Sequence, residues 1–259
     1  MESSDRFVEM VTSVDDVRLD FGALCIAAHA HPGLVVDDWI ARIDEIAGAC
    51  TDVSLDAVVA ELFGRRGFQG DLENYDDPEN SFLDSVVERR CGIPISLSVL
   101  VIEVARRLGI SVLPVGMPGH FLVRAAECPD HWCDPFHGGR LLTREQCHAL
   151  FDTVYRGTRA FEETDLLPVS ARSVLARMLA NLENGELARD PVQLAWMCEL
   201  HLAIPGVSVT DGVQLLRRLA RVVDPVRAAG AYERMAEGVD DEVAKRLRSE
   251  ARLLRSRMN

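Results

Sequence analysis

The stretch GIPISLSVLVIEVARRLG, residues 92–109, predicts a buried helix around which the rest of the fold is built. Between Ile93 and Leu108 the polar residues are limited to two serines, one glutamate and two arginines. A helix that is apolar around most of its circumference packs inside a protein. Pro94 suits the first helical turn, where its missing amide hydrogen costs nothing, and glycine, here Gly109, often follows a last turn.

Two short runs rich in β-branched and aromatic residues follow this helix, at residues 110–115 and 121–123. Pro and Gly residues separate them, which predicts strand, turn and strand. His120 directly precedes the second run, and Asp134 lies in the segment WCDPF, residues 132–136. Neighbouring strands lie about 4.8 Å apart, so we expect His120 and Asp134 to be neighbours. Such a carboxylate can orient an imidazole for acid–base chemistry, although a core histidine satisfied by a buried carboxylate has the same sequence pattern.

The residues before the central helix predict more helices and then a long loop. Apolar residues recur at helical spacing over residues 14–63, whereas residues 64–78 are rich in Gly, Asn, Asp and Pro. Long ordered loops in compact domains are often functional, and this one places Tyr75 and Asn80 close to the central helix. The alternative is a simple connector in which Asn80 or Ser81 caps the next helix.

After the hairpin, the pattern predicts a polar connector over residues 153–169 and then an all-helical tail. We expect a domain boundary at Pro168, which gives a first domain of residues 1–168 and a second of residues 169–259. Asp190-Pro191 and Asp224-Pro225 recur at a spacing of 34 residues, each with Asp as N-cap and Pro at the first helical position. This period is typical of tetratricopeptide repeats, and the alternative is an accidental pair of similar helix starts.

Composition and charge exclude several classes of protein. The chain has 259 residues, 48% of them hydrophobic and 27% charged, and its net charge is −13. An acidic chain argues against nucleic-acid or anionic-membrane binding, which needs clustered cations. No apolar stretch reaches the roughly 20 residues that span a bilayer, and the N-terminus lacks signal-peptide features. Seven widely spread cysteines indicate free thiols, so we expect a cytoplasmic protein.

The motifs around the central helix resemble those of the bacterial SirB-type proteins, a branch of the transglutaminase-like superfamily that is related in fold to papain-type cysteine proteases. The motifs are NSFL (80–83), RRxGIPISL (89–97), RLGI (107–110), PGHFLV (118–123) and DPFxGG (134–139), where x marks a position outside the motif. The resemblance implies an α+β fold: a transglutaminase-like core with a central helix against a small antiparallel sheet, N-terminal helices, and an α-helical, tetratricopeptide-like tail.

The resemblance also implies a catalytic triad, of which His120 and Asp134 match the second and third members. The family's cysteine lies about 15 residues before the glycine that closes the helix, and here that position is Pro94. Two substitutes lie nearby. Cys91 is the first candidate, because a thiol near a helix N-terminus has a lowered pKa. Ser96 is the second, although a small hydroxyl there can equally bind a nearby carbonyl.

We expect four further residues to contact a substrate or partner, and these are Tyr75, Asn80, Arg90 and Phe121. A metal site is a weaker interpretation. Cys128, His131, Cys133 and His137 lie within ten residues, whereas structural zinc sites usually draw on two separated pairs. We therefore predict no metal ion and no cofactor.

Two functions remain open. The first is thiol-dependent hydrolysis or acyl transfer at an amide or thioester, through Cys91, His120 and Asp134. The second is a non-catalytic regulatory module that binds a peptide or protein in the former cleft, with the helical repeats as a second surface. The sequence does not identify the peptide, protein or acyl substrate.

Overall fold

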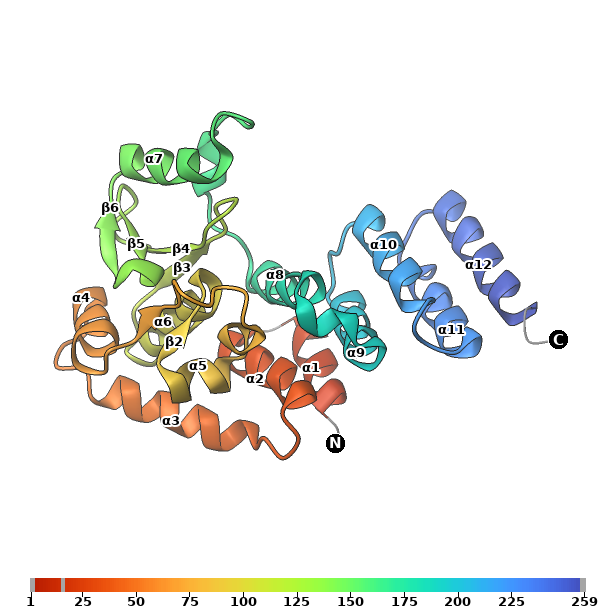
Figure 1. The fold of residues 1–259 in the computed structure, drawn as a ribbon, viewed down its shortest axis with the longest axis horizontal. Helices are drawn as coiled ribbons and strands as arrows, with labels where there is room; N and C mark the ends of the chain where they lie inside the picture. Colours follow the sequence, from red (N-terminus) through yellow and green to blue (C-terminus); the bar gives the residue numbers. More distant parts are fainter. Residues whose placement is uncertain (1–2, 15–16, 257–259) are drawn as a thin grey trace. The chain divides into compact units, whose positions relative to one another are not determined.

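The computed structural model describes residues 3–14 and 17–256 (Figure 1). The chain forms two compact units, of which the larger is Asp16–Met178. The smaller combines Met1–Asp15 with Leu179–Asn259. The division falls within helix α8 (Ala171–Asn184), later in the chain than the boundary expected at Pro168.

The larger unit is a set of helices around a small sheet. Its helices are α2 (Leu19–Ala30), α3 (Val36–Gly48), α4 (Leu55–Val59) with the π-helical segment η1 (Ala60–Arg65), α5 (Leu83–Arg89), α6 (Pro94–Arg107) and α7 (Arg144–Tyr155). Its strands are β1 (Gln69–Gly70), β2 (Cys91–Gly92), β3 (Val112–Val115), β4 (Leu122–Ala125), β5 (Trp132–Asp134) and β6 (Arg140–Leu142).

Helix α6 is the central helix that the sequence predicts. Every residue from Pro94 to Ala105 is buried. Pro94 occupies the first turn, and Gly109 follows the end of the helix with a φ of +74°, a conformation that glycine adopts without strain. The helix packs against α2, α3 and α5 and also against β3 and β4, so it forms the core of this unit.

The main sheet is antiparallel, in the order β3-β4-β5-β6. The predicted hairpin is thereby confirmed, because Val115 pairs with Leu122 and Val123 with Cys133. This register brings the turn before β4, which contains His120, close to Asp134 at the end of β5. A second, two-stranded parallel sheet joins β1 to β2, and the sequence does not predict it because its strands have only two residues each.

The loop that precedes α5 is tied down at Asp71 and Asn80. The backbone amide of Asp71 donates to Gly92 O at 3.0 Å, and its carboxylate accepts from the backbone of Glu73 and Asn74. The Asn80 amide donates to Asp71 Oδ2 at 3.0 Å and to Asn74 O at 2.8 Å. These hydrogen bonds hold the loop to β2, the strand that precedes α6.

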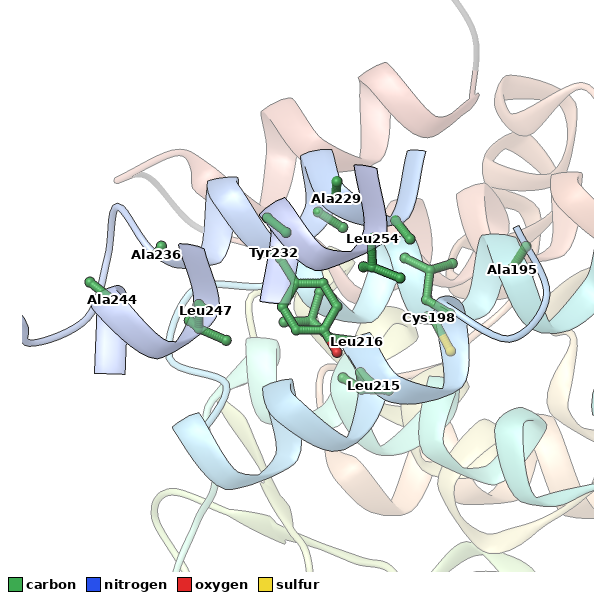
Figure 2. Packing of buried hydrophobic residues seen from close by; sticks show 14 residues of the cluster. Ala195, Cys198, Leu215, Leu216, Ala229, Tyr232, Ala236, Ala244, Leu247 and Leu254 are labelled. Carbon is green, nitrogen blue, oxygen red and sulfur yellow. The ribbon is translucent and has the colours of Figure 1, made fainter. Parts of the chain in front are cut away.

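The smaller unit contains α1 (Ser3–Thr12), α9 (Pro191–Ala203), α10 (Val209–Leu219), α11 (Pro225–Met235) and α12 (Asp241–Ser256). Asp190 and Asp224 cap α9 and α11 as expected, each accepting from the amide two residues on. Its core consists of Leu, Ala and Cys side chains around Tyr232 (Figure 2). No helix within residues 3–14 and 17–256 is long and apolar enough to cross a membrane.

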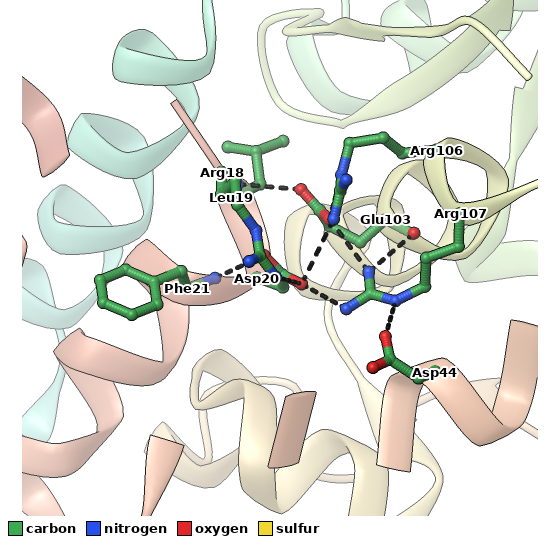
Figure 3. Close-up of polar contacts among 8 residues, drawn as sticks. All are labelled: Arg18, Leu19, Asp20, Phe21, Asp44, Glu103, Arg106 and Arg107. Atoms are coloured by element: carbon green, nitrogen blue, oxygen red, sulfur yellow. Dashed lines mark hydrogen bonds and ion pairs between the residues drawn. The ribbon is translucent and has the colours of Figure 1, made fainter. Parts of the chain in front are cut away.

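An ion network fixes α6 in place within the larger unit (Figure 3). Arg107 donates to Asp20 Oδ2 at 2.6 Å and to Glu103 Oε2 at 3.1 Å, and it also pairs with Asp44. Burial raises the pKa of Asp20, but Arg18 and Arg107 outweigh it and leave that pKa lowered. Burial and the charge of Asp20 raise the pKa of Glu103. Two buried carboxylates thus share the Arg107 guanidinium, while Arg18 also pairs with Asp20 and Arg106 with Glu103.

Replacing Arg107 by methionine should strongly destabilise the larger unit. The change keeps an apolar stem but removes the cation that Asp20 and Glu103 share, so that Asp20 keeps only Arg18 and Glu103 only Arg106 as close partners. We expect a loss of about 1.5–3 kcal/mol. Urea denaturation followed by tryptophan fluorescence measures the loss.

The matched control is Arg144→Met, which breaks the pair between two exposed residues, Arg144 and Glu163. Such a surface pair contributes at most about 1 kcal/mol. Equal losses in the two variants would contradict the assigned importance of the Arg107 network.

Candidate functional site

The structure brings His120 and Asp134 together, as the hairpin predicts. Asp134 is the last residue of β5, and His120 lies in the turn just before β4. His120 Nε2 lies 2.9 Å from Asp134 Oδ1, and both side chains are buried. Gly119 has a φ of +76°, and a Cβ there would lie 2.6 Å from Val154 Cγ1, so this turn needs glycine for two reasons.

A second imidazole, from His137, binds the same carboxylate. His137 Nδ1 lies 2.7 Å from Asp134 Oδ2. Asp134 caps the 3₁₀ turn η3 (Pro135–His137), and residues three apart in such a turn lie above one another. From the sequence, His137 is expected only in the cysteine-rich segment and not beside this pair. The spacing Asp-Pro-x-His is the signal that could have revealed it, because Pro at the start favours a tight turn.

Asp134 is held as a carboxylate by its two neighbours. Burial raises the pKa of Asp134, but hydrogen bonds and charge from His120 and His137 outweigh burial and leave that pKa lowered. An ionised carboxylate accepts only, so each imidazole donates its proton to it. The proton of His120 is then on Nε2, and the lone pair of Nδ1 is available to act as a base.

Arg177, in α8, fixes the turn that carries His120. Its guanidinium donates to Met117 O at 3.1 and 3.2 Å and to His120 O at 2.9 Å. Burial lowers the pKa of Arg177, and its guanidinium lies 5.3 Å from the centre of the Phe121 ring. Arg177 comes from a helix far along the chain, so no local pattern in the sequence identifies it.

An aromatic wall and a groove adjoin the two imidazoles. Phe136 contacts His120, His137 and Tyr75 edge-on, with ring centres 6.0, 5.2 and 5.8 Å apart. Phe136 and His137 also line a groove of about 620 Å³. Its remaining lining residues are mostly apolar or glycine: Val59, Ala60, Phe63, Gly64, Phe68, Gln69, Gly70, Leu72 and Gly138.

The expectation of a lowered pKa for Cys91 is wrong. Burial raises the pKa of the Cys91 thiol, and the charge of Asp71 together with a hydrogen bond to it raises this pKa further. Arg89 and the Gly92 amide only partly oppose this. The physical reason is position: Cys91 lies in β2, before the N-cap of α6, where it is partly buried and close to Asp71.

Ser96 is fully buried and makes three hydrogen bonds. Its hydroxyl donates toward Asn80 O at 2.6 Å and Ile93 O at 3.1 Å, and it accepts from the Ile93 amide at 3.1 Å. The hydroxyl therefore joins the start of α6 to the preceding loop. This is the alternative role that the sequence allows for it.

The four expected binding residues lie in different environments. Tyr75 is half exposed beside Phe136. Asn80 and Phe121 are fully buried, so their side chains do not reach a ligand at the surface. Arg90 ends α5 with a left-handed φ of +57° and donates to Arg66 O at 3.2 Å. Of the four, Tyr75 and Arg90 present surface to a ligand.

The cysteine-rich segment lies elsewhere. Cys128, His131 and Cys133 line a separate cavity of about 450 Å³. In the described part of the chain, the His, Cys, Asp and Glu side chains that converge as closely as metal ligands are those of His120, Asp134 and His137.

Replacing Asp134 by asparagine should destabilise the protein in a pH-dependent way. A lowered pKa in the folded state contributes stability above the unfolded value, and this contribution disappears as the pH falls through the folded pKa. We expect a loss of about 1.5–3 kcal/mol near pH 5, which shrinks as the pH falls below about 4. Urea denaturation of both proteins across this range measures it.

Asp152→Asn is the control, since Asp152 is an exposed carboxylate beside the exposed His148. It should change stability by no more than about 0.5 kcal/mol. A loss in Asp134→Asn that stays constant or grows below about pH 4 would contradict the assigned charge state.

Comparison with known proteins agrees with this architecture. A family model described as the transglutaminase-like superfamily matches residues 35–180. The chain is 37% identical over 206 residues to a UPF0162 protein of Xylella fastidiosa, covering 73% of this chain and 72% of that protein. It is 33% identical over 168 residues to a UPF0162 protein of Pseudomonas aeruginosa, with 62% of each chain covered.

A more distant relative is a larger protein, and the match covers only part of it. The mouse F-box only protein 21 is 32% identical over 187 residues, which are 65% of this chain and 27% of that protein. No solved structure matches the chain. The matched region contains α6, the sheet, His120 and Asp134, and the chain belongs to the transglutaminase-like superfamily.

Proposed function

We propose that this protein is a non-catalytic member of its superfamily that binds a polypeptide segment in the groove beside His137. The observation that carries this proposal is that neither candidate nucleophile is activated. A thiol or hydroxyl nucleophile needs a nearby base or a lowered pKa. Ser96 is fully buried, and its hydroxyl is hydrogen-bonded to the backbone of Asn80 and Ile93. The pKa of Cys91 is raised.

The groove supports a polypeptide as the ligand. Its volume of about 620 Å³ lies within the usual range for ligand sites. Apolar side chains line it, and Leu72 at its rim is 75% exposed. A partly apolar peptide would cover Leu72 from solvent and pack beside the buried Phe136.

The helical tail supplies a second surface. Helices α9 and α11 begin 34 residues apart with the same Asp-Pro start, which supports a tetratricopeptide-like pairing of α9 with α10 and α11 with α12. Together with the motifs around α6, this supports assignment to the SirB-type branch. All seven cysteines are free thiols, which supports a reducing compartment such as the cytoplasm.

One observation favours a second candidate function, thiol-dependent acyl transfer. The contact between His120 and Asp134 is the base and orienting group that such chemistry requires. A bound substrate would then have to bring the Cys91 thiol toward His120 Nδ1.

Alkylation rates separate the two functions. With a raised pKa, Cys91 should react with iodoacetamide more slowly than the exposed Cys128. Peptide mapping after a limited exposure of the native protein measures both rates. His120→Ala should leave the rate at Cys91 unchanged. A Cys91 that reacts fastest, and that loses this reactivity in His120→Ala, would establish the second function instead.

A peptide display experiment tests the groove. Peptides selected from a random phage-displayed library against the native protein should bind Leu72→Asp at least about tenfold more weakly, because a carboxylate at the groove rim must be desolvated on binding. Titration by fluorescence anisotropy measures the affinities.

The matched control for this variant is Leu141→Asp. Leu141 is exposed but lines the separate cavity near Cys128, so its replacement should leave peptide binding unchanged. Binding that survives Leu72→Asp and is lost in Leu141→Asp would contradict the assigned groove.

A further inference from the structure

Three side chains, one of which (His137) lines the groove, bring their ligating atoms together. One nitrogen of His120, one of His137 and a carboxylate oxygen of Asp134 all lie within 4.8 Å of one another. The contacts to Asp134 are 2.9 and 2.7 Å. The two imidazole rings lie 28° from parallel, with centres 5.7 Å apart. The Asp134 carboxylate therefore joins two rings that are stacked on each other.

The chain fixes this convergence by two independent means. The 3₁₀ turn η3 places His137 over Asp134. The pairing of β4 with β5 and the anchoring of the preceding turn by Arg177 place His120. A set of donors that rigid elements hold in advance costs little to organise around a ligand. The sequence alone predicts no metal site here, because it brings His120 to Asp134 through the hairpin but does not place His137 beside them.

Two imidazoles and one carboxylate are a known set of metal ligands. Zinc enzymes use two histidines and one carboxylate with an open fourth position, and iron(II) sites use the same set. We propose that His120, Asp134 and His137 bind one divalent transition-metal ion. This inference goes beyond the peptide-binding function and does not depend on it.

Binding requires only a modest rearrangement. The two nitrogens that face Asp134 carry protons, and in a neutral imidazole the proton can move to the other nitrogen through solvent. Arg140 Nε lies 3.8 Å from Asp134 Oδ2. Its side chain is 53% exposed, so it can swing into solvent when a cation enters.

The surroundings allow entry and leave an open coordination position. Asp134 is fully buried and His120 nearly so, whereas the side chain of His137 is 36% exposed and lines the groove. Phe136 covers both rings edge-on. Three protein ligands therefore hold the ion at the groove wall, where water or a donor group of a bound molecule completes the coordination.

Metal titration of the full chain tests the proposal. Equilibrium dialysis with Zn²⁺ should give one ion per chain. Co²⁺ should bind at the same place and give the visible absorption of a four- or five-coordinate site. His137→Gln should weaken Zn²⁺ binding by at least about 100-fold, since even outer-shell changes cost 10–100-fold. Circular dichroism checks that the variant is folded.

The control variant is His148→Gln. His148 is an exposed histidine with Asp152 at 3.5 Å, and it therefore resembles one half of the site. Its replacement should leave Zn²⁺ binding unchanged. Absence of stoichiometric binding overturns the proposal, and so does binding that persists in His137→Gln but disappears when the cysteines are alkylated.

Discussion

Arg107 neutralises two buried carboxylates at the end of α6, and the position of the whole core depends on this contact. Asp20 comes from α2, Asp44 from α3 and Glu103 from α6 itself. A slide of α6 by one turn would separate Arg107 from Asp20, a buried carboxylate of another helix, and from Asp44 on α3. Hydrophobic burial alone tolerates several registers, whereas these contacts between helices favour the observed one.

With α6 fixed in this way, the sheet and the candidate site follow. The helix packs against β3, β4 and η3. These elements carry or flank Asp134 and its two neighbours, His120 and His137. Ser96 then links the first turn of α6 to Asn80. The hydroxyl of Ser96 is therefore a structural contact, and the polar side chains that converge at the candidate site are one carboxylate and two imidazoles.

The sequence predicts the parts of this arrangement that follow from local periodicity. The apolar run from Ile93 to Leu108 and the strand pattern around Pro118 predict α6 and the hairpin, and the hairpin predicts the contact between His120 and Asp134. The place of His137 depends on a three-residue turn, and that of Arg177 on a distant helix. Neither leaves a periodic signal. The expectation of a lowered pKa for Cys91 rested on its place near the start of α6. Burial and the charge of Asp71 raise that pKa instead, and neither follows from a local sequence pattern.

The contacts of Asp71 and Asn80 also have a consequence for ligand binding. They hold one side of the groove, next to Leu72, to the strand beside α6. Under the proposed peptide-binding function, this wall is already in place before a ligand arrives, so binding requires no opening of this side of the groove.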